Sequence, residues 1–299
     1  MYPAHVDIKE VGPRDGLQNE ATFIQTADKV ALVNALSNTG LRYIEVSSFV
    51  NPKWIPQLAD AADVLAQIKR ERDVTYAALV PNMHGLERAL AVDVDEVSVF
   101  MSASEGHNQS NINKSIDETF PVLQPVIDAA LRAGKTVRGY ISTVIACPID
   151  GPTKPAQVRF VADKLFSMGV SEISLGDTIG VGVPTQVQAL LTDLTKYFQP
   201  SQLAMHFHDT RGTALANVVE SLQHGITKFD SAIGGLGGCP YAKGASGNVA
   251  TEDLLYLLHE MGIDTGVDLH KMQQAALLME QLLQKPLHSK LAAIARGNQ

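Results

Sequence analysis

Short β-rich runs and longer amphipathic runs alternate along the whole chain. The β-rich runs, dominated by apolar and β-branched residues, lie at 6–11, 43–49, 74–80, 96–102, 136–145, 172–177, 203–209 and 228–233. The segments between them repeat apolar residues at helical spacing, as in 26–40, 59–70 and 154–169. Several of these segments end where a left-handed glycine commonly closes a helix, at Gly40, Gly134, Gly169 and Gly225. The pattern therefore predicts eight successive strand–helix units.

Strands that alternate with helices predict an α/β fold with a parallel sheet, and eight units are the number that closes a TIM (β/α)8 barrel. The alternative is an open doubly wound sheet, which usually carries a glycine-rich dinucleotide turn after its first strand. That turn here reads VGPRDGLQNE, which is not such a fingerprint. Two further helical stretches follow, at about 250–262 and 268–296. We expect one catalytic domain over 1–299, with the barrel at about 5–262 and a C-terminal helical appendage at about 263–299.

Composition and charge exclude several classes of function. The net charge is −8 and no run of lysine and arginine occurs, which argues against a nucleic-acid-binding protein. No apolar run approaches the length of a membrane span. Two cysteines, Cys147 and Cys239, cannot form a disulfide framework in a chain of this length, so we expect a reducing cytoplasm. The N-terminal MYPAHVDIKEVG enters the strand pattern at once, which leads us to expect no presequence.

Polar residues gather at the predicted carboxyl ends of the strands, where the active sites of TIM barrels form. They include Arg14 and Asp15, Glu45, Asp177, His206, His208 and, in the glycine-rich loop after the eighth strand, Cys239 and Asn248. Charged residues in otherwise apolar strands are costly to bury without partners. Their concentration at one rim is therefore the main functional signal in the sequence.

The segment AMHFHDTRG places His206 and His208 two residues apart, so that on a strand both point to the same face. With Asp15 they could bind a divalent cation. Imidazole, carboxylate and amide ligands suit Mg²⁺ or Mn²⁺ in octahedral geometry, whereas zinc more often recruits thiolate or a third histidine. The alternative is that both histidines are interior side chains hydrogen-bonded to Asp177 and Glu45. The spacing alone leaves both interpretations open.

Two other candidates also have a structural and a functional interpretation. Arg14 could be an ion-pair partner of a carboxylate on a neighbouring strand, or a cation that faces substrate. Cys239 could be an inert small residue, but it lies in GGLGGCPYAKGASGN, and so many glycines predict a mobile loop. We therefore favour a reactive thiol on an active-site lid.

Five motifs together resemble one enzyme family, the 3-hydroxy-3-methylglutaryl-CoA lyases of the metal-dependent TIM-barrel lyase/synthase superfamily. The motifs are EVGPRDGLQNE, YIEVSSFVNPKWIPQLAD, EISLGDTIGVG, AMHFHDTRG and GGLGGCPYAKGASGNVATED. They occur in order at the ends of five different predicted strands. The RDG and HxH elements mark the superfamily, and the cysteine-bearing glycine loop is similar to that of the lyase branch.

The resemblance implies cleavage of a 3-hydroxy-3-methylglutaryl-CoA thioester to acetyl-CoA and acetoacetate, with Mg²⁺ or Mn²⁺ as cofactor and a homodimer as the assembly. It also implies roles for individual positions. The implied metal ligands are Asp15, His206, His208 and Asn248. The implied catalytic residues are Arg14, Asp15, Glu45, Asp177, His206 and Cys239. The residues implied to lie near the CoA arm are Asn111 and Lys114. Membranes and nucleic acids are not expected as partners.

Two positions depart from the family pattern. The sequence reads ACPIDG where an aromatic often follows the proline, and Ala21 stands where a lysine is frequent. Both lie near the predicted rim, so a relative that acts on a longer 3-hydroxy-3-alkylglutaryl-CoA is an alternative. A second alternative is a synthase of the same superfamily that condenses acetyl-CoA with a 2-keto acid. The resemblance fits a cytoplasmic enzyme of the bacterial type.

Overall fold

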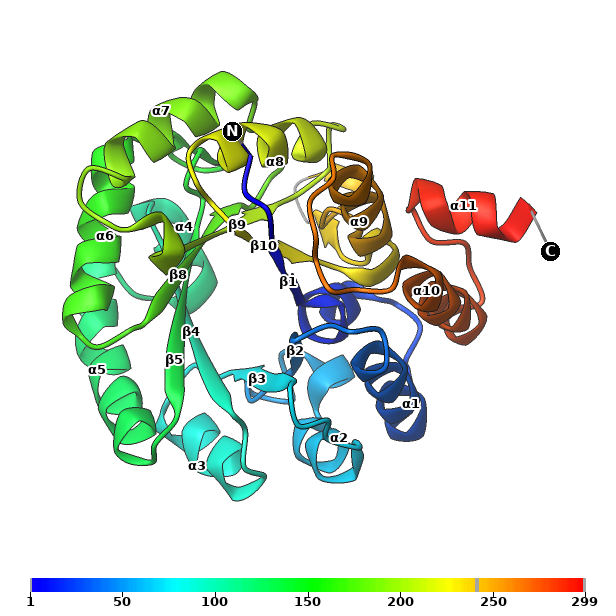
Figure 1. The fold of residues 1–299 in the computed structure, drawn as a ribbon. Coiled ribbons are helices and arrows are strands. Elements are labelled where there is room, and N and C mark those ends of the chain that lie inside the picture. Colours follow the sequence, from blue (N-terminus) through cyan, green and yellow to red (C-terminus); the bar gives the residue numbers. More distant parts are fainter. Residues whose placement is uncertain (1, 240–241, 298–299) are drawn as a thin grey trace.

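A closed barrel of parallel strands forms the centre of the molecule, in a computed structural model that describes residues 2–239 and 242–297 (Figure 1). The strands follow the order β1-β10-β9-β8-β5-β4-β3-β2. Their bounds are β1 Asp7–Glu10, β2 Tyr43–Ser48, β3 Thr75–Leu79, β4 Glu96–Ser102, β5 Thr136–Ser142, β8 Glu172–Asp177, β9 Leu203–Phe207 and β10 Lys228–Ser231. Because β1 pairs with both β2 and β10, the sheet has no open edge, which confirms the predicted TIM barrel.

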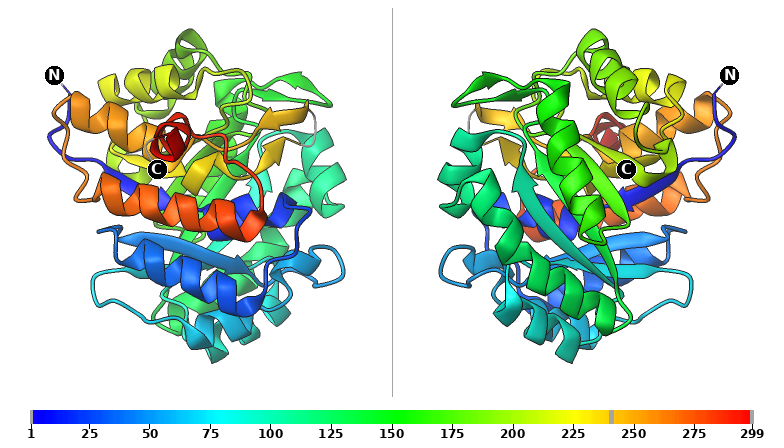
Figure 2. Two further views of the ribbon diagram at one scale, coloured as in Figure 1. Left: turned by 90° about the vertical axis from the view of Figure 1, so that its right-hand side faces the viewer. Right: turned by 90° about the vertical axis from the view of Figure 1, so that its left-hand side faces the viewer.

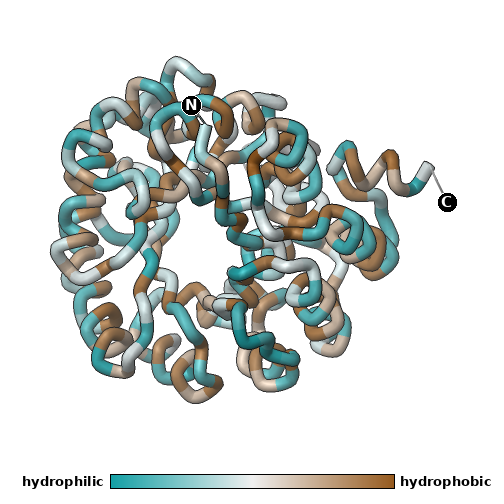
Figure 3. Tube along the Cα trace, in the orientation of Figure 1, coloured by the Kyte–Doolittle hydropathy of each residue, from teal (hydrophilic) through white to brown (hydrophobic). Residues whose placement is uncertain are grey.

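Helices surround the barrel and bury one face each against it. They are α1 Thr26–Ser37, α2 Ala61–Gln67, α3 Met83–Ala91, α4 Glu105–Ile112, α5 Ile116–Arg132, α6 Pro155–Ser167, α7 Pro184–Leu194 and α8 Ala214–Gln223. Apolar and polar segments alternate along their tubes in Figure 3, as amphipathic helices require. In α8, for example, Val218 and Leu222 lie one turn apart and are both buried. Among the described residues, no helix combines the length and apolar content needed to cross a bilayer.

The fifth predicted strand is shorter than its sequence pattern suggests. We expected it to run over 136–145, but β5 ends at Ser142 because Thr143 has a left-handed φ of 59°. This conformation is unfavourable for a β-branched residue. Thr143 is held there by Thr178 and Ser102: its N–H donates to Thr178 Oγ1 at 2.8 Å, and its hydroxyl lies 2.6 Å from Ser102 Oγ.

The C-terminal appendage differs from its prediction at one point. Helices α9 (Thr251–Glu260), α10 (Leu269–Leu283) and α11 (Lys290–Gly297) follow the barrel, and the stretch expected at about 268–296 is interrupted after α10. Gln284 adopts a left-handed φ of 53°, and Pro286 follows two residues later. Helix α11 packs against α9 and α10 (Figure 2). The connection between α10 and α11 contacts the turn after β10, where the N–H groups of His288 and Ser289 donate to the Gly234 carbonyl.

Two of the predicted helix-terminal glycines differ in the space that a side chain would have. Gly40 and Gly134 have φ values of 97° and 75°, but a Cβ on Gly40 would lie 2.2 Å from the Gly266 carbonyl oxygen, whereas one on Gly134 would meet no atom within 4 Å. We expect Gly134→Ala to lower the free energy of unfolding by about 1 kcal/mol and Gly40→Ala by more than about 2 kcal/mol. Urea unfolding of both variants would measure this difference, and equal losses would contradict the close contact.

Candidate functional site

The Arg-Asp pair lies on a single π-helical turn, Gly12–Gly16, directly after β1. The N–H groups of Arg14 and Asp15 both donate to the Val11 carbonyl, at 3.1 and 2.7 Å. Glycine is required at both ends of this turn. A Cβ on Gly12 would lie 2.5 Å from Glu10 Oε1, and one on Gly16 would lie 2.6 Å from Leu236 Cβ. Such turns often occur at functional sites, and this one holds two charged side chains at the mouth of the barrel.

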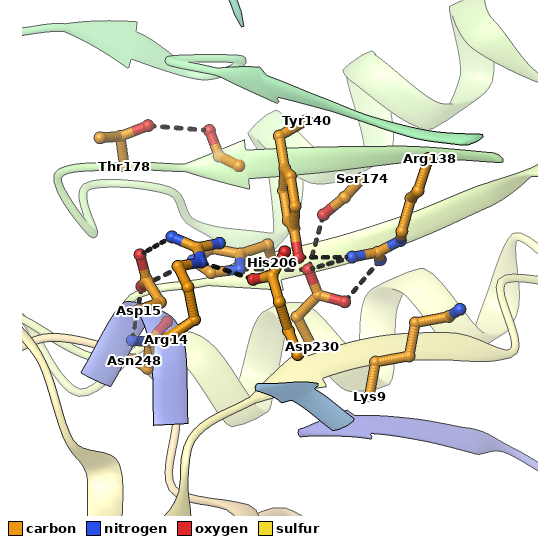
Figure 4. A network of polar contacts seen from close by, with 12 residues as sticks. Lys9, Arg14, Asp15, Arg138, Tyr140, Ser174, Thr178, His206, Asp230 and Asn248 are labelled. Carbon is orange, nitrogen blue, oxygen red and sulfur yellow. Dashed lines mark hydrogen bonds and ion pairs between the residues drawn. The ribbon is translucent and has the colours of Figure 1, made fainter. Parts of the chain in front are cut away.

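The two histidines of β9 point to the same side, as the strand periodicity predicts. His206 lies within β9 and His208 directly after it, both are buried, and their ring centroids are 5.3 Å apart. His206 Nε2 is 3.8 Å from Asp15 Oδ2. One ligand atom from each of Asp15, His206 and His208 lies within 4.8 Å of the others. The structure therefore brings these three predicted metal ligands together. Figure 4 shows two of them, Asp15 and His206.

The fourth predicted ligand, Asn248, is anchored beside this triad. Its amide donates to Asp15 Oδ2 at 2.8 Å and to the Leu236 carbonyl at 3.0 Å, and its backbone forms a β-bridge with His208. Gln18, which is not among the predicted site residues, donates to the other oxygen, Asp15 Oδ1, at 2.8 Å. Amide donors thus fix both oxygens of the Asp15 carboxylate.

Arg14 is paired on two sides. Its Nε donates to Glu45 Oε2 and its Nη1 to Asp15 Oδ1, each at 2.5 Å. Burial opposes the charged form of the guanidinium, but Glu45 and Asp15 outweigh it and raise the pKa of Arg14. Burial also opposes ionisation of Asp15, yet Arg14, His206 and His208 together lower the pKa of Asp15 to about 2. Asp15 is therefore a carboxylate at neutral pH, the form that binds a cation.

The chemistry of these donors fits a divalent cation. His208 Nδ1 is buried and has no hydrogen-bond partner among the described residues. Burial, and then His206, lower the pKa of His208 to about 4, so its imidazole is neutral and offers a lone pair. The alternative, in which both histidines bond to Asp177 and Glu45, is not what the structure has. His206 Nδ1 instead faces Asp230 Oδ2 at 3.2 Å.

The two other predicted acidic residues have different environments. Glu45 is fully buried in β2, where its Oε2 accepts from Arg14 and from the Tyr140 hydroxyl, the latter at 3.2 Å. Asp177 ends β8 and accepts the N–H groups of Val181 at 3.2 Å and Gly182 at 2.8 Å. Burial raises the pKa of Asp177. Its carboxylate thus holds the turn after β8.

A cavity of about 360 Å³ opens above the triad. Arg14, Asp15, His206 and His208 line one part of it, and Asn111 from α4 lines another. The other residue expected near the CoA arm, Lys114, does not line this cavity; its carbonyl accepts from the Asn108 amide at 3.0 Å. The structure thus brings Asn111, but not Lys114, to the same cavity as the triad.

The glycine-rich loop begins at the rim of the same cavity. Gly238 lines the cavity and starts β11 (Gly238–Cys239), which pairs with β12 (Ala242–Ser246) as a hairpin. The side chain of Cys239, and residues 240 and 241, lie outside what the structure describes. At the base of the hairpin, the Gly247 N–H donates to the Gly237 carbonyl at 3.1 Å. The role of Cys239 therefore stays a prediction.

Gln18, Tyr140 and Asp230 are not among the site residues predicted from the sequence. Asp230 lies inside the eighth predicted strand, and an acidic residue among buried neighbours was the available signal. Tyr140 lies in β5, and a single tyrosine in a strand gives no such signal. Its position in the cavity depends on contacts with residues distant in sequence, such as Glu45.

Comparison with known proteins agrees with this geometry. The HMGL-like family model matches residues 5–279. Hydroxymethylglutaryl-CoA lyase YngG of Bacillus subtilis is 56% identical over 97% of both chains. The 3-hydroxy-3-isohexenylglutaryl-CoA/hydroxy-methylglutaryl-CoA lyase of Pseudomonas aeruginosa is 52% identical, also over 97% of both. A solved "HMG-CoA lyase from Acenitobacter baumannii in complex with coenzyme A and 3-methylmalate" is 37% identical, with a TM-score of 0.93 and coverage of 97% of this chain and 95% of that one. The chain belongs to the HMGL-like family.

Proposed function

We propose that this protein cleaves 3-hydroxy-3-methylglutaryl-CoA to acetyl-CoA and acetoacetate in a metal-assisted retro-Claisen reaction. The observation that carries the proposal is the convergence of Asp15, His206 and His208 beside the Arg14 guanidinium in one cavity. Membership of the HMGL-like family supports it, as do the names of the relatives. The complex of a 37% identical relative with coenzyme A supports an acyl-CoA substrate.

The reaction breaks the C2–C3 bond, converts the C3 hydroxyl to a ketone and leaves C2 as a thioester enolate. A divalent cation, Mg²⁺ or Mn²⁺, held by Asp15, His206, His208 and Asn248 would acidify the C3 hydroxyl and orient the substrate. Of the four candidates for the base, Asp15 and His206 line the cavity. Glu45 and Asp177 do not line it; Glu45 Oε2 accepts from Arg14, and the Asp177 carboxylate accepts from the Gly182 N–H. Both ring nitrogens of His206 also have partners, Nδ1 at Asp230 and Nε2 at the proposed cation, so we assign the hydroxyl proton to Asp15.

Arg14 is placed to stabilise the enolate. Its Nε donates to Glu45 and its Nη1 donates to Asp15. Among the described contacts, Nη2 therefore remains available to donate into the cavity that Arg14 lines. A donor aimed at developing charge is worth about 3–4 kcal/mol in the transition state. The enolate carbon then takes a proton, which we assign to the Cys239 thiol, and acetyl-CoA is complete. Closure of the glycine-rich loop over the cavity would exclude water from the carbanion.

The apolar part of the cavity favours a second candidate substrate. Val50, Ile55, Leu79 and Phe100 line it. These side chains could receive a C3 substituent larger than methyl. The Pseudomonas aeruginosa relative is named for both an isohexenyl and a methyl substrate. We therefore propose that longer 3-alkyl analogues are accepted as well.

Assembly and location follow from the resemblance alone. We propose a homodimer, which sedimentation equilibrium would test. We also propose a cytoplasmic location, in line with the cytoplasmic 3-hydroxy-3-methylglutaryl-CoA lyase of Rattus norvegicus, 50% identical over 97% of this chain.

Removal of the cation or of a ligand should abolish turnover. We expect acetoacetate to form from 3-hydroxy-3-methylglutaryl-CoA with Mg²⁺ or Mn²⁺, and EDTA to stop its formation. His208→Ala should lower kcat/KM by about 10³-fold or more, because loss of a ligand would weaken binding of the cation that acidifies the C3 hydroxyl. His270→Ala, at an exposed position of α10, is the control and should retain wild-type activity. Full turnover in EDTA would contradict the metal assignment, and condensation of acetyl-CoA with a 2-keto acid instead of cleavage would favour the synthase.

The apolar wall should set the preference for the C3 substituent. We expect Phe100→Ala to raise the ratio of kcat/KM for an isohexenyl substrate over the methyl substrate by about tenfold, because the missing ring enlarges the apolar part of the cavity. Phe160→Ala, which removes an exposed phenyl ring of α6, should leave the ratio unchanged. The ratio is measured by competition between the two thioesters, and an unchanged ratio in Phe100→Ala would show that the substituent lies elsewhere.

A further inference from the structure

A buried polar network lies directly beneath His206 (Figure 4). Asp230 on β10 is at its centre, with a fully buried side chain. One of its oxygens, Oδ2, lies 3.2 Å from His206 Nδ1 and accepts the Ser174 hydroxyl at 2.7 Å. The other, Oδ1, accepts Arg138 Nη2 at 2.6 Å. The ring nitrogen of His206 that faces away from the triad is thus directed at a carboxylate.

Arg138 fixes the orientation of that carboxylate. Its side chain is fully buried, its Nε donates to Glu172 Oε1 at 2.7 Å, and its Nη1 donates to the Tyr140 hydroxyl at 2.7 Å. A guanidinium offers only donors, so each Asp230 oxygen within its reach must act as an acceptor. An ionised carboxylate paired with a buried guanidinium has no proton of its own to offer to His206.

The proton between Asp230 and His206 must therefore come from the imidazole. With Nδ1 as the donor, a neutral ring carries its lone pair on Nε2, and Nε2 is the atom that lies 3.8 Å from Asp15 Oδ2. This is the tautomer that can ligate a cation held by the triad. The opposite tautomer would place a hydrogen atom on Nε2, toward the cation.

We propose that Asp230, held by Arg138 and Ser174, is a positioning residue that fixes His206 as the Nδ1–H tautomer and so makes its Nε2 a metal ligand. The inference rests on the proposed metal site and adds to it residues that do not themselves contact the cation. Carboxylates that orient metal-ligating histidines in this way typically change metal affinity 10–100-fold when they are replaced.

The substitution Asp230→Asn tests this role with almost no change in shape. Arg138 contacts both oxygens of Asp230, Oδ1 through Nη2 at 2.6 Å and Oδ2 through Nη1 at 3.3 Å. The asparagine oxygen would keep the shorter contact with Nη2, and the amide NH₂ would then face His206 Nδ1. Nδ1 becomes an acceptor, and its proton moves to Nε2. We expect the Kd for Mn²⁺, followed by electron paramagnetic resonance of the free ion, to rise 10–100-fold relative to the wild-type protein.

Glu172→Gln is the matched control. It also removes a carboxylate that accepts from Arg138, but Glu172 bonds to Lys9, Lys228 and Arg138 and is not in contact with His206. Its Kd for Mn²⁺ should stay within about threefold of the wild-type value. Equal losses of affinity in the two variants would mean that the network acts only through general stability, and would overturn the proposal.

A second measurement does not depend on whether Asp230→Asn folds. Histidine-labelled, metal-free wild-type protein is observed by ¹H–¹⁵N correlation of the ring nitrogens, with His206→Gln used to assign the signal. We expect an Nδ1–H tautomer for His206, and an Nε2–H signal in the wild type overturns the proposal even if Asp230→Asn fails to fold. Wild-type protein that does not bind Mn²⁺ would remove the proposed metal site and this role together. Tight wild-type binding with an unchanged Asp230→Asn would remove this role alone.

Discussion

Charge pairing inside the barrel is the constraint on which the site depends. An ionised group taken out of water must find opposite charge or hydrogen bonds, and loss of one member of a buried pair is strongly destabilising. Here the groups form one chain of contacts that leads from one metal-ligand candidate to another: Asp15, Arg14, Glu45, Tyr140, Arg138, Asp230 and His206. The chain has one gap, the 3.8 Å between His206 Nε2 and Asp15 Oδ2, and that gap lies where a cation would bind.

The sign of the charge along this chain favours a cation. Three carboxylates, on Asp15, Glu45 and Asp230, face two guanidiniums, on Arg14 and Arg138. An excess of negative charge in a buried site beside the neutral His208 imidazole favours a divalent ion, and a bound ion would complete the pairing. Stability and function therefore depend on the same contacts.

The sequence was sufficient to predict the barrel and the triad because both follow from periodicity. Eight strand–helix units predict closure, and the two-residue spacing of His206 and His208 places both rings on one face of β9. Because the carboxyl ends of all strands of a TIM barrel lie at the same rim, Asp15, which follows the first strand, is expected near the two histidines. These inferences need no knowledge of contacts between distant segments.

What the sequence could not predict depends on such contacts. Asp230 and Arg138 are 92 residues apart, and nothing local to either identifies the other as its partner. Asp177 stands at a strand end like Asp15, yet its carboxylate turns to the amides of Val181 and Gly182 because the following turn needs acceptors. The early end of β5 at Thr143 likewise comes from hydrogen bonds to Ser102 and Thr178, which override a strand-like pattern.

The most direct test of the central claim is a crystal structure of the protein soaked in Mn²⁺, with anomalous diffraction recorded at the manganese edge. We expect one strong anomalous peak within about 2.5 Å of an Asp15 oxygen and of one nitrogen from each of His206 and His208. A peak at another place, or a triad that stays without a peak at saturating Mn²⁺, would contradict that claim.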